Sequence, residues 1–275
     1  MVESIFPNQW NGLLKNVGKW EGSFTRMDLD GKVLEDMPTL VQIEALGENT
    51  VRQVNRYYHP DNSLKSEKEY IITSLSQGLL FFENGAFSQG SMQLAPFAEF
   101  GGEFGLIHEN RRLRLVLLYN NDNQFSRFTL IREQLAEGGA QPSASLSVDA
   151  LLGEWEGEAV QLDQNHFDRQ TYSTRLVVKK EGSRIVQNIQ AGTFQMTSSA
   201  EIVGSRLDFG KVQVRLLAGG ASCVCPTIAE IGKPFFLEIG WLIAPDLRQR
   251  ITRNFNGKGE WTGVTLITER KTGLG

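Results

Sequence analysis

The chain has 275 residues, 40% of them hydrophobic, and a formal net charge of −4. This length allows one large domain or two ordinary ones, and the mild negative charge excludes a general attraction to nucleic acid or to an anionic membrane. No run approaches the roughly 20 apolar residues of a membrane span. The N-terminus lacks the pattern of a signal peptide, and two cysteines make no disulfide framework. We therefore expect a cytoplasmic protein.

The chain starts with a helical pattern that gives way to alternation. Trp10, Leu13, Leu14 and Val17 have the spacing of an apolar helix face, which predicts one or two helical turns within residues 5–17. From Gly18 onward the alternation of a strand places Trp20 on one face with every second residue. Short strand-like runs separated by turns then predict a sandwich or barrel. They are 39–46, 51–58, 67–75, 78–82, 91–94, 99–108, 111–119 and 125–133.

Residues 134–147 interrupt this pattern. Ala136 to Ser145 is small and polar without strand formers, which indicates a linker, and Ser147 to Leu152 predicts a short capped turn. We predict domains at 1–135 and 148–275, joined by a linker at 136–147. Strand-like runs resume in the second half at 153–162, 172–180, 184–191, 193–203, 206–209, 211–217, 222–225, 235–243, 247–255 and 260–270.

The two halves repeat short motifs in the same order. Gly-x-Trp-x-Gly occurs at 18–22 and 153–157, so that Trp20 and Trp155 are 135 residues apart (155 − 20). Together the matches indicate an internal duplication. We predict an all-β chain of two tandem antiparallel barrels with short capping helices. The other matches are 103–105 with 238–240, 112–114 with 248–250, and 129–133 with 265–269.

The repeated tryptophans are predicted to plug the floor of each barrel, where the neighbouring glycines permit a close approach of the first strand. A cationic side chain from the last strand often covers such an indole. We expect Arg132 or Arg127 to do so in the first half and Arg270 in the second.

The repeated arginines allow two interpretations. A tight hairpin at Glu109-Asn110 would set Gly105 opposite Arg114 and Glu103 diagonal to it, and Gly240, Arg250 and Glu238 would repeat this arrangement. In one interpretation these are exposed ion pairs worth well under about 1 kcal/mol, with Leu113, Leu115, Leu117 and Tyr119 in the core. In the other, Arg114 and Arg250 face inward and bind a ligand carboxylate. The candidate ligand-binding residues are Arg114, Arg250, Glu103, Glu238, Trp20 and Trp155.

No motif predicts a catalytic residue, a metal site or a cofactor. Cys223 and Cys225 share a strand face without further metal ligands, and a disulfide between them would be strained, so we expect buried thiols. His59, His108 and His166 lack a paired nucleophile. Whether the protein is an enzyme stays open, with the absence of activity favoured.

Gly18-Lys19-Trp20 and Gly153-Glu154-Trp155 each open an all-β unit, and in this both halves resemble calycins, the lipocalin-like and fatty-acid-binding-type barrels. Residues 81–90, 103–105, 111–116 and 129–133 are similar to a family of uncharacterised, mainly cyanobacterial proteins. That family is known as a domain of unknown function with a lipocalin-like second half, and it implies no activity.

At the level of fold and opening motif, the chain also resembles the S- and T-type phycobiliprotein lyases. These proteins hold an open-chain tetrapyrrole, a bilin, and deliver it to a client protein.

The sequence leaves three functions open as hypotheses. The first is a non-enzymatic binder of a small apolar or amphipathic ligand in a barrel cavity. The second is a bilin-handling protein, and the third is a structural or protein-interaction barrel with a filled interior.

Overall fold

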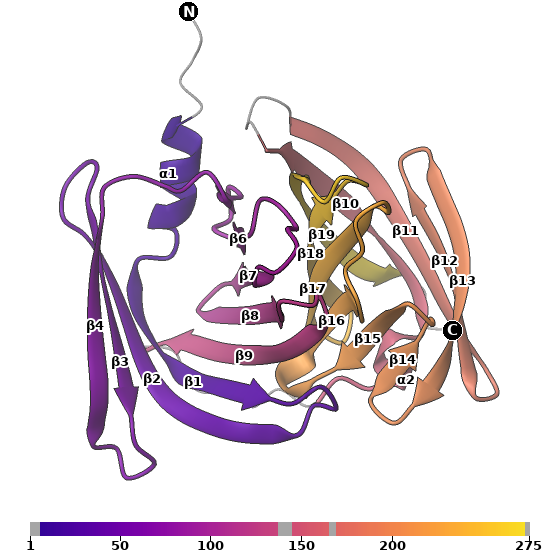
Figure 1. Cartoon of the computed structure of the whole chain (residues 1–275), viewed down its shortest axis with the longest axis horizontal. Helices are drawn as coiled ribbons and strands as arrows, with labels where there is room; N and C mark the ends of the chain where they lie inside the picture. The colour runs from indigo at the N-terminus through magenta and orange to yellow at the C-terminus, as the bar shows by residue number, and fades with distance from the viewer. Residues whose placement is uncertain (1–5, 137–144, 165–168, 273–275) are drawn as a thin grey trace, which may run out of the picture. The chain divides into compact units, whose positions relative to one another are not determined.

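The computed structural model describes residues 6–136, 145–164 and 169–272, which form two compact units (Figure 1). Unit 1 comprises the described parts of Met1–Ser91, Gly101–Leu118 and Ser126–Gln141. Unit 2 comprises Met92–Phe100, Tyr119–Phe125 and the described part of Pro142–Gly275. Within unit 2, the Phe100 ring lies 5.0 Å from that of Phe255. Two segments of the first half therefore pack with the second half, and residues 137–144 of the predicted linker lie outside the described residues.

Unit 1 contains a curled antiparallel sheet of nine strands, in the order β4-β3-β2-β1-β9-β8-β7-β6-β5 (Figure 1). Its helix α1 precedes the first strand and contacts β5. The elements are α1 (Phe6–Leu14), β1 (Gly18–Met27), β2 (Val33–Ala45), β3 (Val51–Tyr58), β4 (Leu64–Ile72), β5 (Leu79–Phe81), β6 (Phe87–Gly90), β7 (Phe100–His108), β8 (Arg111–Tyr119) and β9 (Phe125–Leu135).

Unit 2 contains a closed antiparallel barrel of ten strands in sequence order. The side chain of Ser147 accepts a hydrogen bond from the backbone of Ala150, which confirms the predicted capped turn. The elements are α2 (Val148–Leu151), β10 (Gly153–Asp163), β11 (Arg169–Glu181), β12 (Arg184–Ala191), β13 (Phe194–Val203), β14 (Arg206–Asp208), β15 (Val212–Leu216), the 3₁₀ turn η1 (Ala218–Gly220), β16 (Ala221–Pro226), β17 (Phe235–Ala244), β18 (Leu247–Phe255) and β19 (Trp261–Thr272).

The prediction of two all-β antiparallel halves is confirmed, and the register shows why only the second half closes. In unit 2, β14 pairs with both β13 and β15, whereas no strand among the described residues of unit 1 joins β4 to β5. The backbone N–H of Leu216 on β15 donates to the carbonyl of Ser205, 2.8 Å away, at the turn that leads into β14. Phe81 on β5 is the counterpart of Leu216 in unit 1. Register leads from Gly105 to Phe81 across two strand pairs, and it leads from Gly240 to Leu216 in the same way.

A side chain of α1 takes over the hydrogen bonds of the missing strand. The N–H of Phe81 donates to Oε1 of Gln9 at 2.7 Å, and Nε2 of Gln9 donates to the carbonyl of Phe81 at 2.9 Å. Covering an edge strand with a helix satisfies backbone groups that would otherwise stay unpaired. The helix therefore ends the sheet of unit 1 where unit 2 continues with a strand.

One predicted strand, 91–94, is absent. Only Gln93 forms an isolated bridge, to Glu260. The backbone of this segment is committed elsewhere in unit 2, since Leu94 donates to the carbonyl of Gly259 and Trp261 donates to that of Met92. Among the described residues, neither helix has the length or the run of apolar side chains that crossing a bilayer requires.

Candidate functional site

The repeated tryptophans occupy matching places in the two units. Trp20 and Trp155 are both fully buried in the apolar cores of their units. Each indole N–H donates to a backbone carbonyl four residues upstream, that of Asn16 at 2.8 Å and that of Leu151 at 3.0 Å. The prediction that both tryptophans are buried is confirmed, and their role as floor plugs stays a prediction.

Beside each tryptophan, register places a glutamate, a glycine and a threonine in one row. Gly22 on β1 lies opposite Glu133 on β9 and Thr39 on β2. Gly157 on β10 has the same relation to Glu269 and Thr174. A Cβ atom at either glycine would overlap the backbone carbonyl of the last strand, that of Arg132 or Thr268, so no larger residue fits.

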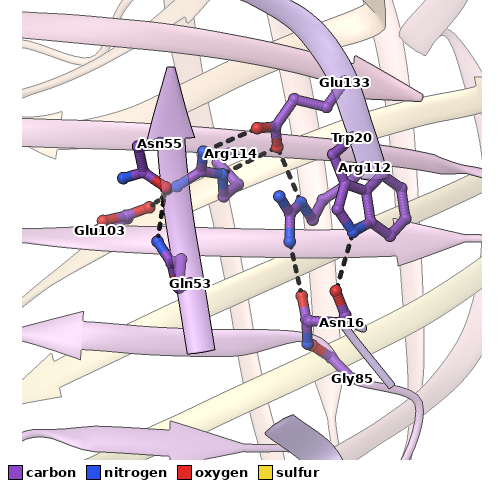
Figure 2. Close-up of polar contacts among 9 residues, drawn as sticks. All are labelled: Asn16, Trp20, Gln53, Asn55, Gly85, Glu103, Arg112, Arg114 and Glu133. Carbon is purple, nitrogen blue, oxygen red and sulfur yellow. Dashed lines mark hydrogen bonds and ion pairs between the residues drawn. The ribbon is translucent and has the colours of Figure 1, made fainter. Parts of the chain in front are cut away.

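In unit 1 the glutamate of this row anchors a buried group of ions, the first charge cluster, which consists of Glu103, Arg112, Arg114 and Glu133 (Figure 2). Glu133 accepts from Nε of Arg112 at 2.8 Å and from Nε and Nη2 of Arg114 at 3.0 and 2.8 Å. Nη1 of Arg114 donates to Glu103 at 2.6 Å. Arg112 also donates to the side chain of Asn16 at 3.1 Å.

Unit 2 repeats this arrangement as the second charge cluster, which consists of Glu238, Arg248, Arg250 and Glu269. Arg250 donates from Nε and Nη2 to Glu269 at 3.2 and 3.3 Å. Its Nη1 lies 3.3 Å from Glu238. Nε of Arg248 lies 3.2 Å from Glu269 but forms no hydrogen bond within the described residues. The second cluster is therefore more loosely bonded than the first.

Burial and charge act against each other in both clusters. Burial alone would raise the pKa of Glu133, but the charges and hydrogen bonds of Arg112 and Arg114 lower it to about 2. Burial lowers the pKa of Arg112 and of Arg248. The two neighbouring glutamates outweigh burial at Arg114 and raise its pKa. Two cations and two anions in each cluster make it neutral overall.

The arginine beside each tryptophan comes from the penultimate strand. Arg112 on β8 lies with Cζ 4.4 Å from the centroid of Trp20, and Arg248 on β18 lies 5.9 Å from that of Trp155. Nζ of Lys271, on the last strand, is 5.0 Å from the Trp155 centroid.

The prediction that Arg132 or Arg127 covers Trp20 and that Arg270 covers Trp155 was wrong. Arg132 pairs in register with Ser23, and Arg270 with Glu156, so both lie on the opposite face of the sheet from the indoles. Arg127 is exposed. The strand-face parity of these positions is the reason for the error.

The ion pairs predicted for Arg114 and Arg250 are confirmed, and so is the register predicted for Arg250, but neither arginine is exposed. Gly240 lies opposite Arg250, and both Arg114–Glu103 and Arg250–Glu238 are ion pairs. Each arginine is 9% exposed, which excludes the surface-pair interpretation. Leu113, Leu115, Leu117 and Tyr119 are buried as expected. Binding of a ligand carboxylate by these arginines stays a prediction, and their guanidinium groups already bind two glutamates each.

Sequence reasoning missed Glu133, Glu269, Arg112 and Arg248 as members of the clusters. All four fall inside the repeated motifs that revealed the duplication. The available signal was a glutamate repeated near the end of the last strand of each unit, Glu133 and Glu269, on the same face as the tryptophan. It marks the carboxylate that holds each pair of arginines.

The two clusters differ in their exposure to solvent. The side chain of Glu103 is 28% exposed, whereas that of Glu238 is 8% exposed. In unit 1, Gln53 and Asn55 of β3 lie beside the first charge cluster and hydrogen-bond each other at 2.9 Å (Figure 2). By register their counterparts in unit 2 are Gln187 and Ile189. The hydroxyls of Thr39 and Thr174 are buried without a hydrogen bond within the described residues.

The described residues contain no group of three or more histidine, cysteine or acidic side chains that could hold a metal ion. Cys223 and Cys225 are buried free thiols, as expected. His59 is exposed, and His108 lies 3.8 Å from Glu109. His166 lies outside the described residues.

Comparison with known proteins places this geometry in a family. Residues 7–138 match the N-terminal domain of the family of unknown function DUF3598. Residues 142–272 match the family described as the C-terminal domain of biogenesis factor required for ATP synthase 1. No curated protein matches the chain.

Among solved structures, a DUF3598 protein of unknown function from Nostoc punctiforme is 41% identical, with a TM-score of 0.92 over 96% of this chain and 99% of that one. An S-type phycobiliprotein lyase from Guillardia theta is 10% identical, with a TM-score of 0.37 over 46% of this chain and 91% of that one. Transferrin binding protein B from Haemophilus parasuis is 7% identical, with a TM-score of 0.27 over 86% of this chain and 54% of that one.

Proposed function

The chain belongs to the DUF3598 family, and we propose that it is a non-enzymatic binding protein for a small amphipathic ligand held by unit 1. The site is the Trp20 face, the side of the unit 1 sheet that carries Trp20 and Phe24 and their register partners. One observation carries the proposal. Every side chain of the second charge cluster is at most 10% exposed, whereas the first charge cluster reaches solvent through Glu103, which is 28% exposed.

Polar groups beside this opening have bonding capacity to spare. Among the described residues Glu103 accepts a hydrogen bond only at Oε1, from Arg114, which leaves Oε2 to accept from a ligand. Within the described part of the chain, the hydroxyl of Thr39 has no hydrogen bond, and the side chain of Asn55 bonds only through its oxygen, to Gln53. A few polar groups that fix orientation beside apolar surface are typical of small-molecule sites.

Half-buried aromatic rings supply the apolar part. Phe24 and Tyr57 pack edge to face with centroids 5.5 Å apart. Arg114 lies 5.3 Å from the Phe24 centroid, which connects the rings to the first charge cluster. The counterpart of Tyr57 in unit 2 is Ala191, so this aromatic pair is not part of the repeated core.

Native mass spectrometry of the purified protein, followed by titration with 1-anilinonaphthalene-8-sulfonate, tests the proposal. We expect a retained small molecule, or saturable fluorescence enhancement at one site. Tyr57→Ala should weaken dye binding about tenfold, because an aromatic contact is lost. Phe194→Ala, which removes an exposed ring from β13 of unit 2, is the matched control and should leave the affinity unchanged. Equal effects of the two variants, or no bound molecule and no enhancement, would refute the proposal.

A second candidate is a protein-interaction role, which the match of residues 142–272 to an ATP synthase biogenesis factor favours. Phe97 of unit 2 adds a structural observation, since the residue is 87% exposed on a backbone with φ of +60°. A large apolar side chain held in this strained and exposed state is unusual. Size-exclusion chromatography with purified ATP synthase catalytic-head subunits tests the role. Co-elution that Phe97→Ser abolishes would support it, and separate elution would refute it.

The bilin-handling alternative remains a proposal at the level of fold. Mixing the protein with a purified bilin should give a shifted visible absorption band if this alternative is correct. An unchanged bilin spectrum would refute it.

A further inference from the structure

We propose that the ligand of the Trp20 face is an organic anion, and that Lys68 binds its acidic group. Lys68 belongs to a basic rim of this face that also includes Arg26 and Lys65. This inference rests on the proposed function and specifies the charge of the ligand. It also moves the acid-binding role away from Arg114, whose guanidinium already binds two glutamates.

The first argument is that charge is divided between the two faces of β3 and β4. On the face opposite Trp20, Arg52 pairs with Glu69 at 2.8 Å and Arg56 pairs with Glu67 at 2.6 Å, so these charges cancel. On the Trp20 face, the charged side chains of β3 and β4 are all cationic. The Nζ atom of Lys65 reaches Glu35 and Met37 of this face, and Lys68 lies opposite Asn55.

The second argument is the net charge of the rim. Glu35 is the single acidic partner, 3.4 Å from both Arg26 and Lys65. Lys68 has no ion pair within the part of the chain that the structure describes. Three cations and one anion leave two positive charges on this face of a protein whose net charge is −4. A local positive field on an acidic protein attracts anionic ligands.

The third argument comes from the duplication. Trp20 pairs across the sheet with Val41, which pairs with Asn55, which in turn pairs with Lys68. The same path in unit 2 runs from Trp155 to Leu176, Ile189 and Met196. The pair Arg26–Glu35 corresponds to Gln161–Gln170, which is uncharged. Both units keep the charge cluster, and only unit 1 has the rim, so the fold does not require these cations.

The position of Lys68 also suits a carboxylate. Its register partner Asn55 donates none of its side-chain N–H groups within the described residues. An ammonium group and an amide N–H on adjacent strands offer two donors to one acidic group. The apolar part of the ligand would then extend toward Tyr57, one row along β3, and Phe24.

Calorimetric titration of the full chain with decanoate and with 1-decanol tests the inference. We expect decanoate to bind at least fivefold more tightly than decanol, with an affinity that falls as salt rises. Lys68→Met, which installs the methionine found at the matching position of unit 2, should remove the preference for decanoate. Lys68→Arg, which keeps the positive charge, should retain it. Lys179→Met, at an exposed lysine of unit 2, is the matched control and should change neither titration.

The outcomes separate this inference from the proposed function. Equal affinities for the two probes, or a decanoate preference that survives Lys68→Met, would overturn the inference and leave ligand binding intact. Binding of neither probe would overturn both. A parallel titration with phosphatidylglycerol vesicles distinguishes a free acid from a lipid surface. Binding to vesicles without binding of monomeric decanoate would overturn the inference too.

Discussion

Units 1 and 2 build the same core from the same repeated residues and differ in what surrounds it. Each buries a tryptophan, a glycine that lets two strands approach and a neutral cluster of two arginines and two glutamates. Unit 2 closes its barrel over this core, whereas unit 1 ends at α1 and leaves Glu103 partly exposed. What both units keep is required by the fold, and what only unit 1 has is where we place function.

The immediate surroundings of the tryptophans show the same contrast. In unit 1, Asn16 accepts from Arg112 at 3.1 Å and donates to the carbonyl of Gly85 at 3.0 Å. Leu151 takes the place of Asn16 in unit 2, where Lys271 instead donates to the carbonyl of Ala150 at 3.1 Å. The first charge cluster is thus bonded more completely, which predicts that it contributes more to the stability of its unit.

The largest effect should follow from removing the central carboxylate. Glu133→Gln leaves Arg112 and Arg114 buried without their shared anion, and we expect a loss of about 3–5 kcal/mol from the stability of unit 1. Glu269→Gln should cost unit 2 less, because its ion pairs are longer. Urea unfolding, fitted with a separate transition for each unit, measures both. Glu67→Gln, in an exposed pair, is the control, and an equal cost in both units would contradict the asymmetry.

Acid should weaken unit 1 through the same residue. The pKa of Glu133 is about 2 in the folded chain, against an ordinary value of 4.5. A lowered folded-state pKa stabilises the fold above pH 4.5, and this contribution is lost as the pH falls toward 2. Converted at 1.36 kcal/mol per pH unit, the loss is about 3 kcal/mol. Carboxyl chemical shifts of Glu133 measured by NMR would check the titration, and a midpoint near 4.5 would refute it.

The repeat itself was visible in the sequence, and the alternation around Trp20 and Trp155 predicted that both are buried in two β units. The hairpin argument also placed Glu103 beside Arg114 and Glu238 beside Arg250 correctly. These succeeded because strand parity and hairpin register are local properties.

What failed depended on contacts that no local pattern encodes. Strand-face parity excludes Arg132, but the choice of Arg112 in its place depends on β8 lying next to β9 in the sheet. The open end of unit 1 depends on Gln9, which bonds a strand 72 residues away. The segment 91–94 has the residues of a strand, but its backbone pairs with residues near Gly259. Tertiary packing decides such cases against intrinsic preference.

Gln9 offers a sharper test of how the two units end their sheets. Gln9→Leu keeps the volume but leaves the buried N–H and carbonyl of Phe81 without partners, which should cost unit 1 about 2 kcal/mol. Asn11→Leu, at an exposed position of the same helix, is the matched control and should be close to neutral. Urea unfolding measures the difference. If both variants were neutral, the side chain would not stand in for a strand.

The smallest effect separates fold from function most directly. Thr39 and Thr174 both bury a hydroxyl without a hydrogen bond within the described residues, and replacing such a group with an isosteric methyl removes a desolvation cost. Thr39→Val and Thr174→Val should therefore each be neutral or stabilise by up to about 1 kcal/mol. The two variants should differ in their affinity for decanoate, because only Thr39 lies on the face that we propose as the site. A several-fold weaker affinity for decanoate in Thr39→Val alone would assign that hydroxyl to the ligand. An equal affinity in both variants would confine the threonine to the repeated core, and destabilisation by either would mean that the hydroxyl has a partner such as a bound water.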